Sequence, residues 1–451
     1  MKTEQKRQKK TAVTTRKGFL LLVVLLLSCG VPNTAHAETQ DGQETGTGVS
    51  EDTSGNTGET DSQGGSENGE SGEDTADQPE ENVKLGDMTA VYTTALSDTR
   101  VELRWSLVEG ATAYVIYRKG SRYQEIGQTQ EDFFVDENNA YGKKYTYKVV
   151  PVNEAGEQGK ETVVSFDHRQ IVKITKQKYS YSDMKADLAV LEKTYNRYCR
   201  VDVIGKTAQG RNLYDVVIGN QNADKTLLVV STIHGREYAC TVILMRQIEY
   251  YLRYYNKTIN GLKPAKVLKD MQIHYVVMAN PDGVNISQTT YARWKANSRG
   301  VDLNLNYPYK FVVKGKKGSE GYSGAKAGSE KETQALMSLT KSLKKNTDLC
   351  AVINYHAMGE IVFGDYSGSN SATKKEVRSL YLLTRKLTGY KDAGFYNSTG
   401  HGCYREYVMY GLGIPSITIE VGKHWCPIPY SEYQSIYTKN KMVVLKSANL
   451  Y

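Results

Sequence analysis

The sequence predicts an α/β domain that follows a smaller all-β domain. Short runs of alternating apolar residues, separated by turn residues, fill residues 84–170, and this pattern is typical of an all-β sandwich. Residues 171–451 differ, because short β-branched runs alternate there with segments whose apolar residues recur at helical spacing. With 451 residues, the chain is long enough for two or three domains once its non-globular parts are set aside.

Residues 1–37 have the features of a secretory signal peptide. A basic stretch precedes the apolar run Phe19 to Leu27, which is too short to span a bilayer as a mature helix. A small-x-small site ending at Ala37 predicts cleavage there and a secreted, extracellular protein. A second form of processing stays open, because the Leu-Leu-Ser-Cys sequence ending at Cys29 resembles a bacterial lipobox. A lipid anchor at Cys29 would hold the protein on the outer face of the membrane.

Residues 38–83 predict a disordered acidic linker. They have almost no apolar side chains, so they cannot bury enough surface to offset the entropy lost on ordering. They hold fourteen Asp/Glu and no Lys/Arg, whereas residues 1–37 hold seven Lys/Arg and one Glu. Since the whole chain carries +8, residues 84–451 carry +16. This basic body fits contact with a polyanionic cell wall, or serves solubility alone. Nucleic acid is not a predicted partner, because no nucleic-acid-binding motif is recognisable.

Three strand-like runs carry the prediction for residues 84–170. They are Val101–Trp105, Ala113–Tyr117 and Lys144–Val152. The stretch resembles a fibronectin type III domain, with Trp105 in an early strand and Tyr147 in a late one. We expect both aromatic side chains in the core, because no chemical constellation surrounds them. The resemblance implies a spacer or a wall-binding module.

Residues 171–451 alternate helical and strand patterns. Ser182 is predicted to cap a helix, and Asn280–Gly283 is predicted to form a turn. The predicted strands are Asp215–Ile218, Leu227–Thr232, Ile273–Met278, Cys350–Asn354 and Ser416–Ile419, with a helix at Thr241–Leu252. Strands that alternate with helices imply a sheet covered on both faces.

Four polar residues follow three of these strands. His234 and Glu237 come after the second predicted strand, His356 after the fourth, and Glu420 after the fifth. In open α/β sheets, ligands bind beyond the C-terminal ends of the strands, so we expect these side chains to converge. Two imidazoles and one carboxylate suit a zinc ion that keeps one position open for water. The second carboxylate, Glu420, is then free to take a proton from that water.

The order of short motifs from about residue 179 onward resembles the zinc carboxypeptidase family. The matching motifs are Ile204–Arg211, His234–Glu237, Asn280–Gly283, Gly300–Asn304, His356 and Ile414–Glu420. The resemblance implies that His234, Glu237 and His356 hold one zinc ion. It also implies that Glu420 is the general base and later returns the proton to the leaving amine. The implied fold is a mixed eight-stranded sheet with helices on both faces.

One departure from the family concerns the terminal carboxylate of the substrate. Carboxypeptidases of this family place Arg after the Asn of an Asp-x-Asn motif, and the two residues bind that carboxylate. Here Asn304 is followed by Leu305, whose apolar side chain cannot pair with a carboxylate. Loss of this Arg also resembles family members that cut the γ-D-glutamyl–diamino acid bond of bacterial cell-wall peptides.

The same resemblance assigns further substrate-facing positions. Lys295 stands where many members have the Arg that stabilises the oxyanion, and a solvated lysine is the alternative. Arg405 stands at the floor of the specificity pocket, where a cation favours an acidic substrate group, and an ion pair with Glu406 is the alternative. Arg236 matches a substrate-binding position, and Tyr396 resembles the mobile active-site tyrosine.

These features predict a secreted bacterial zinc metallopeptidase that hydrolyses the γ-D-glutamyl–diamino acid bond of peptidoglycan stem peptides. Asn304 and Arg405 would orient the acidic end of the substrate. A true carboxypeptidase, with Arg405 as a substitute carboxylate anchor, is the alternative. A non-catalytic surface adhesin that works through the β-sandwich is a third, and the complete ligand set with Glu420 disfavours it.

Overall fold

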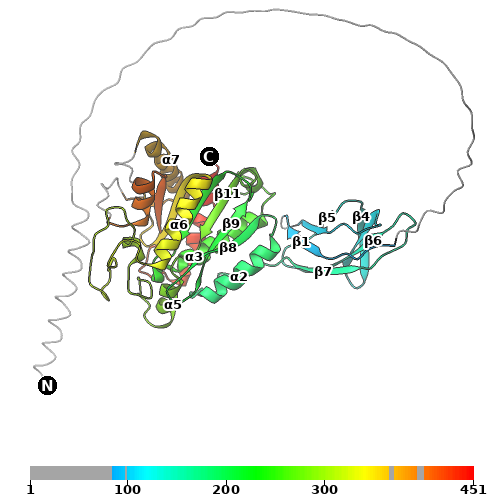
Figure 1. Cartoon of the computed structure of the whole chain (residues 1–451), viewed down its shortest axis with the longest axis horizontal. Coiled ribbons are helices and arrows are strands. Elements are labelled where there is room, and N and C mark those ends of the chain that lie inside the picture. The colour runs from blue at the N-terminus through cyan, green and yellow to red at the C-terminus, as the bar shows by residue number, and fades with distance from the viewer. Residues whose placement is uncertain (1–83, 97–98, 365–369, 394–400) are drawn as a thin grey trace, which may run out of the picture. The chain divides into compact units, whose positions relative to one another are not determined.

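The computed structural model describes residues 84–96, 99–364, 370–393 and 401–451 (Figure 1). The predicted signal peptide and acidic linker, the candidate lipidation site Cys29 and the candidate substrate-binding residue Tyr396 lie outside these ranges. Within the described ranges, no helix is long and apolar enough to cross a membrane.

The described residues between Val91 and Asp167 form two antiparallel sheets. One has the strand order β1-β2-β5 and the other β4-β3-β6-β7. The strands are β1 (Val91–Ala95), β2 (Val101–Trp105), β3 (Ala113–Lys119), β4 (Tyr123–Thr129), β5 (Phe133–Asp136), β6 (Lys144–Val152) and β7 (Thr162–Asp167). The prediction of an all-β region is confirmed. The likeness to a fibronectin type III domain and the boundary at residue 170 stay predictions.

Aromatic side chains form the core of this all-β region. Trp105 and Tyr147 expose 3% and 0% of their surface, and Trp105 packs against Tyr114 with the ring centroids 5.2 Å apart. The Tyr147 hydroxyl donates to Asp136 Oδ2 at 2.9 Å, so the polar end of this buried ring has a partner. Trp105 and Tyr147 therefore have the core role predicted for them.

A mixed eight-stranded sheet organises the described residues from Cys199 onward. Its order is β14-β13-β15-β12-β10-β11-β9-β8. The strands are β8 (Cys199–Lys206), β9 (Asn212–Gly219), β10 (Lys225–Ser231), β11 (Met271–Val276), β12 (Asp348–Ala357), β13 (Ile361–Phe363), β14 (Lys391–Asp392) and β15 (Ser416–Val421). The central strands β15, β12, β10 and β11 are parallel, whereas β9 pairs antiparallel with β11 and β8, and β13 pairs antiparallel with β15. The predicted fold class is confirmed.

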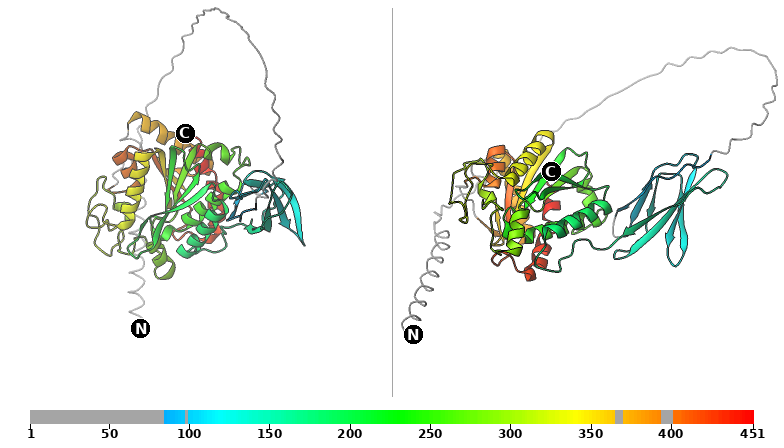
Figure 2. Two further views of the ribbon diagram at one scale, coloured as in Figure 1. Left: turned by 45° about the vertical axis from the view of Figure 1, so that its right-hand side comes forward. Right: turned by 60° about the horizontal axis from the view of Figure 1, so that its bottom comes forward.

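The two faces of this sheet bury separate apolar clusters. Along β10, Leu227 and Val229 join one cluster, while Leu228 and Val230 join the other, as the two-residue period of a strand requires. Helices α2, α3, α7, α9 and α10 contribute to the first cluster, and α6 and α8 to the second. The helices are α2 (Tyr181–Thr194), α3 (Ala239–Arg253), α4 (Pro264–Leu268), α5 (Pro281–Thr289), α6 (Lys331–Asn346), α7 (Ser371–Thr388), α8 (Tyr404–Glu406), α9 (Tyr433–Asn440) and α10 (Val443–Ala448). Helices thus cover both faces (Figure 2).

The start of α2 differs from the prediction. Ser180 caps this helix, not Ser182. The Ser180 hydroxyl oxygen accepts a hydrogen bond from the Asp183 N–H at 3.1 Å, and the Asp183 carboxylate accepts one from the Ser180 N–H at 2.9 Å. This reciprocal arrangement needs an acidic or amide side chain three residues after the cap, and Asp183 stands at that distance from Ser180.

Candidate active site

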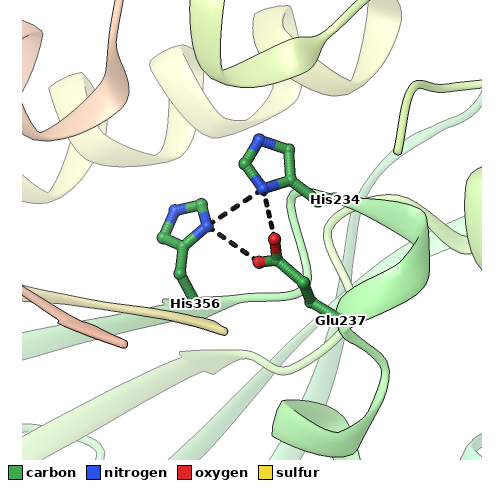
Figure 3. Close-up of side chains that lie close together, drawn as sticks. All are labelled: His234, Glu237 and His356. Atoms are coloured by element: carbon green, nitrogen blue, oxygen red, sulfur yellow. Dashed lines mark hydrogen bonds and ion pairs between the residues drawn. The ribbon is translucent and has the colours of Figure 1, made fainter. Parts of the chain in front are cut away.

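Three side chains converge near the C-terminal ends of two neighbouring parallel strands (Figure 3). His234 and Glu237 follow β10, whereas His356 lies inside β12, two residues beyond the end predicted for that strand. His234 Nδ1 lies 2.7 Å from Glu237 Oε1, and His356 Nδ1 lies 3.0 Å from Glu237 Oε2 and 3.2 Å from His234 Nδ1. All three residues are buried, and their ligand atoms lie within 4.8 Å of one another. Two imidazole nitrogens and a carboxylate that face one point suit zinc.

Close backbone packing shapes the turn that carries His234 and Glu237. The turn η1 (Gly235–Glu237) lies so near α5 that a Cβ on Gly235 would come within 2.4 Å of the Gly283 backbone. Thr232, just before this turn, has a φ of +55°, which is rare for a residue with a branched side chain. Such backbone conformations cluster at functional sites, where the surrounding structure maintains them.

The segment after β11 does not end in the predicted turn. Asn280 is the N-cap of α5, and its side-chain oxygen accepts from the Gly283 N–H at 2.9 Å. Pro281 takes the first helical position, where its missing N–H costs no hydrogen bond. The Asn280 amide also donates to the Ile233 carbonyl at 3.0 Å, so this cap holds the residue before His234. The cap therefore joins α5 to the strand end that leads to the site.

Each imidazole has a further partner on its other nitrogen. His234 Nε2 lies 3.1 Å from Asp302 Oδ1, and Asp302 Oδ2 lies 2.7 Å from Lys295 Nζ. His356 Nε2 lies 2.9 Å from Asn354 Nδ2. Partners of this kind orient metal-binding rings and set their tautomers. Sequence reasoning assigned no role to Asp302 or Asn354. One signal was available, because Asn354 stands two residues before His356 and a strand places both on one face.

The carboxylates beside the imidazoles are held ionised. Burial alone would raise the pKa of Glu237, but the charges and hydrogen bonds of His234 and His356 outweigh it and keep this pKa well below its usual range. Burial likewise opposes ionisation of Asp302, and His234 and Lys295 hold its pKa far below normal. Burial acts to lower the pKa of His234 and of Lys295. The neighbouring carboxylates outweigh this effect, so the pKa of each group lies above its ordinary value.

Glu420 differs from these carboxylates. It lies directly across from His356 in the parallel pairing of β12 and β15. Burial is the main reason that the pKa of Glu420 rises to about 8; the charge of Glu237 adds to the rise, whereas His356 and Lys295 oppose it. A carboxyl group whose pKa lies near neutral pH is suited to taking up and returning a proton.

Lys295 and Arg236, two of the predicted substrate-facing cations, both form ion pairs. Lys295 is half-buried and held by Asp302, which differs from the alternative of a freely solvated lysine. Arg236 Nη2 lies 3.0 Å from Glu320 Oε1, and its Nη1 donates to the Arg293 carbonyl at 3.3 Å. Lys295 and Glu320 border the same cavity of about 200 Å³. Lys295 therefore lies beside a space that a small group can enter, and Arg236 is paired with a residue that borders this space.

Asn304 and Arg405 are connected through α8. Asn304 Oδ1 accepts from the Tyr404 N–H at 3.1 Å, which fastens α8 to the segment that carries Leu305. The Arg405 side chain is buried, and its Nη2 lies 2.7 Å from Glu406 Oε1. The ion pair considered as an alternative is therefore present. The second terminal nitrogen, Arg405 Nη1, is buried and has no hydrogen-bond partner among the described residues.

Comparison with known proteins gives the family. The profile described as zinc carboxypeptidase, Peptidase M14, matches residues 184–432, more than half of the chain. The chain belongs to the zinc carboxypeptidase family. It is therefore a zinc metallopeptidase, and the predicted cofactor, one zinc ion, is confirmed. This leaves the non-catalytic adhesin without support.

Relatives of two kinds match this member of the family. The chain is 26% identical over 302 residues to gamma-D-glutamyl-L-diamino acid endopeptidase 1 of Lysinibacillus sphaericus, covering 61% of this chain and 73% of that one. It is 28% identical over 205 residues to metallocarboxypeptidase A of Trichophyton rubrum, covering 42% of this chain and under half, 47%, of that one. The thrombin-activatable fibrinolysis inhibitor structure (TM-score 0.54, 18% identity) covers 62% of this chain and 79% of its own. Carboxypeptidase A of Helicoverpa armigera (TM-score 0.51, 16% identity) covers 64% and 83%. The two solved structures share the fold.

Proposed function

We propose that this zinc metallopeptidase hydrolyses the γ-D-glutamyl–diamino acid bond of bacterial peptidoglycan stem peptides. Leu305 is the observation that carries the proposal, because it follows Asn304 where carboxypeptidases of the family have an Arg. An apolar side chain cannot form the bidentate pair that holds a free terminal carboxylate. The likeness to a Lysinibacillus sphaericus endopeptidase named for this bond supports the same substrate class.

His234, Glu237 and His356 are the proposed zinc ligands. Their facing atoms are His234 Nδ1, His356 Nδ1 and the Glu237 carboxylate, and this donor set leaves room for water and substrate. Bound there, zinc supplies a Lewis acid that polarises the scissile carbonyl and lowers the pKa of water. Asp302 and Asn354 hold the outer nitrogens of the two rings.

Glu420 and Lys295 are the proposed catalytic residues. In its ionised form Glu420 removes a proton from the attacking water, and it then gives the proton to the leaving amine. In the metal-free site a pKa of about 8 favours the protonated form that the second step needs, while the charge of Lys295 favours the ionised form that the first step needs. The Lys295 ammonium, positioned by Asp302, offers positive charge to the oxyanion.

Arg405, Arg236 and Asn304 are the proposed contacts for the acidic groups of the substrate. Arg405 Nη1 is buried without a partner among the described residues, and a substrate carboxylate would supply one. The carboxylate on the diaminopimelate side chain is such a group. Because Glu406 already balances part of the Arg405 charge, hydrogen bonding to Nη1 matters more here than net charge. Tyr396 stays a predicted contact.

A carboxypeptidase that removes C-terminal residues is the second candidate. The same Arg405 Nη1 favours it, because a buried guanidinium donor can replace the missing Arg as an anchor for a terminal carboxylate. The likeness to a protein named metallocarboxypeptidase A supports this candidate as well.

The proposed place of action is outside the cytoplasm. The predicted signal peptide at residues 1–37 supports a secreted protein, and Cys29 supports a lipid-anchored form as the alternative. The net charge of +16 on residues 84–451 supports contact with a polyanionic cell wall.

Digestion of a defined stem peptide tests the proposed bond. The substrate is L-Ala-γ-D-Glu-meso-diaminopimelate-D-Ala, offered with its terminal carboxylate free or amidated, and the products are identified by mass spectrometry. We expect cleavage into two dipeptides with the free form and at the same bond with the amidated form. Release of D-Ala from the free form alone would contradict the proposal and favour the carboxypeptidase. Glu420→Gln is the control, with activity lowered by about 100- to 10,000-fold in either case.

A further inference from the structure

Asn354 is buried beside a proposed zinc ligand, and its side chain has one hydrogen-bond partner among the described residues. It precedes His356 by two residues in β12, so both side chains project from the same face of the strand. The residue has 0% exposure, and its Nδ2 lies 2.9 Å from His356 Nε2. Its Oδ1 is also buried and has no hydrogen-bond partner among the described residues. An amide whose side chain hydrogen-bonds, among the described residues, only to a metal-binding ring has a role connected with that ring.

A neutral His356 ring carries one proton, on one of its two nitrogens. Nδ1 lies 3.0 Å from Glu237 Oε2 and faces the point where the other ligand atoms converge. A neutral imidazole has a single N–H, so binding zinc through Nδ1 requires that the proton lies on Nε2. An Nε2–H needs an acceptor, and the NH₂ end of an amide cannot accept it.

A side-chain amide can serve either tautomer. With Nδ2 turned toward the ring, Asn354 donates to a bare Nε2, and the ring proton lies on Nδ1 and faces Glu237. A half-turn of the amide brings Oδ1 to the same place, where it accepts the Nε2–H. In the orientation described here, the far end of the amide, Oδ1, has no hydrogen-bond partner in the described part of the chain, so no bond there holds this orientation. The position of the proton on His356 therefore decides between the two orientations.

We propose that Asn354 is a positioning residue for His356, and that its Oδ1 accepts the Nε2–H when Nδ1 binds zinc. The number of protons on His356 does not change in this exchange, because one proton is lost at Nδ1 and one is gained at Nε2 while the amide turns over. An acidic side chain at this position would hold the zinc-binding tautomer alone, and an apolar one would hold neither. The inference rests on the proposed ligand role of His356, and it is independent of which bond the enzyme cuts.

Zinc affinity of two variants of the full chain tests this inference. Asn354→Asp keeps an acceptor toward Nε2, and we expect it to bind zinc at least as tightly as the wild type. Asn354→Leu removes the acceptor, and we expect affinity to fall by about 10- to 100-fold in competition with a chelator. Asn440→Leu is the matched control. Asn440 is equally buried but donates to the Tyr390 hydroxyl at 2.9 Å, so this variant loses a buried amide without touching the ligands.

Nitrogen-15 NMR of the zinc-loaded wild type reads the tautomer directly. In histidine-labelled protein we expect the proton of His356 on Nε2, and a proton on Nδ1 would overturn the inference even if Asn354→Leu does not fold. Unchanged affinity in Asn354→Leu, or equal losses in Asn354→Asp and Asn354→Leu, would overturn it too. A wild type that binds no zinc would instead remove the ligand assignment on which it rests. Cleavage of a bond other than the γ-D-glutamyl–diamino acid bond would not contradict the inference about Asn354.

Discussion

His234 and His356 turn the same ring atom toward the same point, but the chain supports them differently. His234 lies on a turn, and its Nε2 faces Asp302, whose carboxylate accepts hydrogen bonds at any pH near neutral. His356 lies in a central strand, and its Nε2 faces the amide of Asn354, which has a donor at one end and an acceptor at the other. The first support is a fixed charge, and the second is a neutral group that can turn.

Because of this difference, the two supporting residues should contribute differently to zinc binding and to catalysis. In the proposed mechanism, Asp302 connects zinc binding with stabilisation of the oxyanion, because it contacts both His234 and Lys295. The Asn354 amide carries no charge and is not among the groups that shift the pKa of Glu420, which lies directly across from His356 in the neighbouring strand. We therefore expect substitution of Asp302 to affect both zinc affinity and catalysis, and substitution of Asn354 to affect zinc affinity alone.

The largest effect is expected at Lys295, which belongs to the His234 side alone. Lys295→Met removes the charge offered to the oxyanion, and we expect kcat to fall by about 100- to 1,000-fold. Lys295→Arg keeps the charge and the pairing with Asp302, so it should retain most of the activity. Steady-state kinetics on the stem peptide measures both. An equal loss of kcat in the two variants would contradict a role of the Lys295 charge in catalysis.

Removal of the fixed charge itself should have the next largest effect. Asp302→Asn keeps the size of the side chain but gives His234 Nε2 a weaker acceptor, so we expect zinc affinity to fall by about 10- to 100-fold. The chelator competition used for Asn354 measures this as well. Zinc affinity as high as that of the wild type would mean that the two histidines do not differ in the way proposed.

Two carboxyl groups with opposite pKa shifts should give opposite pH effects on the metal-free protein. Asp302 has a lowered folded-state pKa, so its stabilisation is present above the unfolded-state pKa and is lost as the pH falls. Glu420 has a folded-state pKa of about 8 against 4.5 when unperturbed, so its burial costs nothing below pH 4.5 and destabilises increasingly up to pH 8. Urea unfolding with a chelator should therefore show Glu420→Gln more stable than the wild type at pH 8 and equal to it at pH 4.5. A difference in stability between Glu420→Gln and the wild type that does not change with pH would contradict the raised pKa of Glu420.

The smallest effect is expected at Glu320, whose side chain is 65% exposed in its ion pair with Arg236. Exposed pairs contribute at most about 1 kcal/mol, so Glu320→Gln should barely alter unfolding. It should free Arg236 for acidic groups of the stem peptide and lower KM by about two- to fivefold, the range that such a pair energy allows. Glu161→Gln, which breaks an exposed pair with Lys148 in the all-β region, is the control. An equal change in KM for both variants would contradict a contact between Arg236 and substrate.

The site residues that could be predicted from the sequence are those that directly follow a strand. Apolar β-branched runs mark buried strands, so the polar residues directly after them, His234 and Glu237, could be placed at one edge of the sheet. His356 and Glu420 were assigned by the same reasoning, although both lie within strands that continue past the predicted ends. Strand ends are the least certain part of such predictions, because the hydrogen bonds that extend a strand depend on its neighbours.

The supporting residues could not be predicted in the same way. The pairing of Asp302 with His234 joins segments that are distant in sequence, and no local pattern specifies it. Arg236 and Glu320 likewise meet only because the loop bearing Glu320 folds toward η1. The cap of α2 is specified locally, because the three-residue spacing of Ser180 and Asp183 is that of a capping box.

Zinc stoichiometry in two variants tests the central claim most directly, namely that His234, Glu237 and His356 hold the metal while Glu420 does not. Native mass spectrometry after dialysis against a weak chelator counts the ions in the wild type, Glu237→Gln and Glu420→Gln. We expect one zinc in the wild type and in Glu420→Gln, and none in Glu237→Gln. Zinc retained in Glu237→Gln, or lost in Glu420→Gln, would contradict the division between ligands and general base.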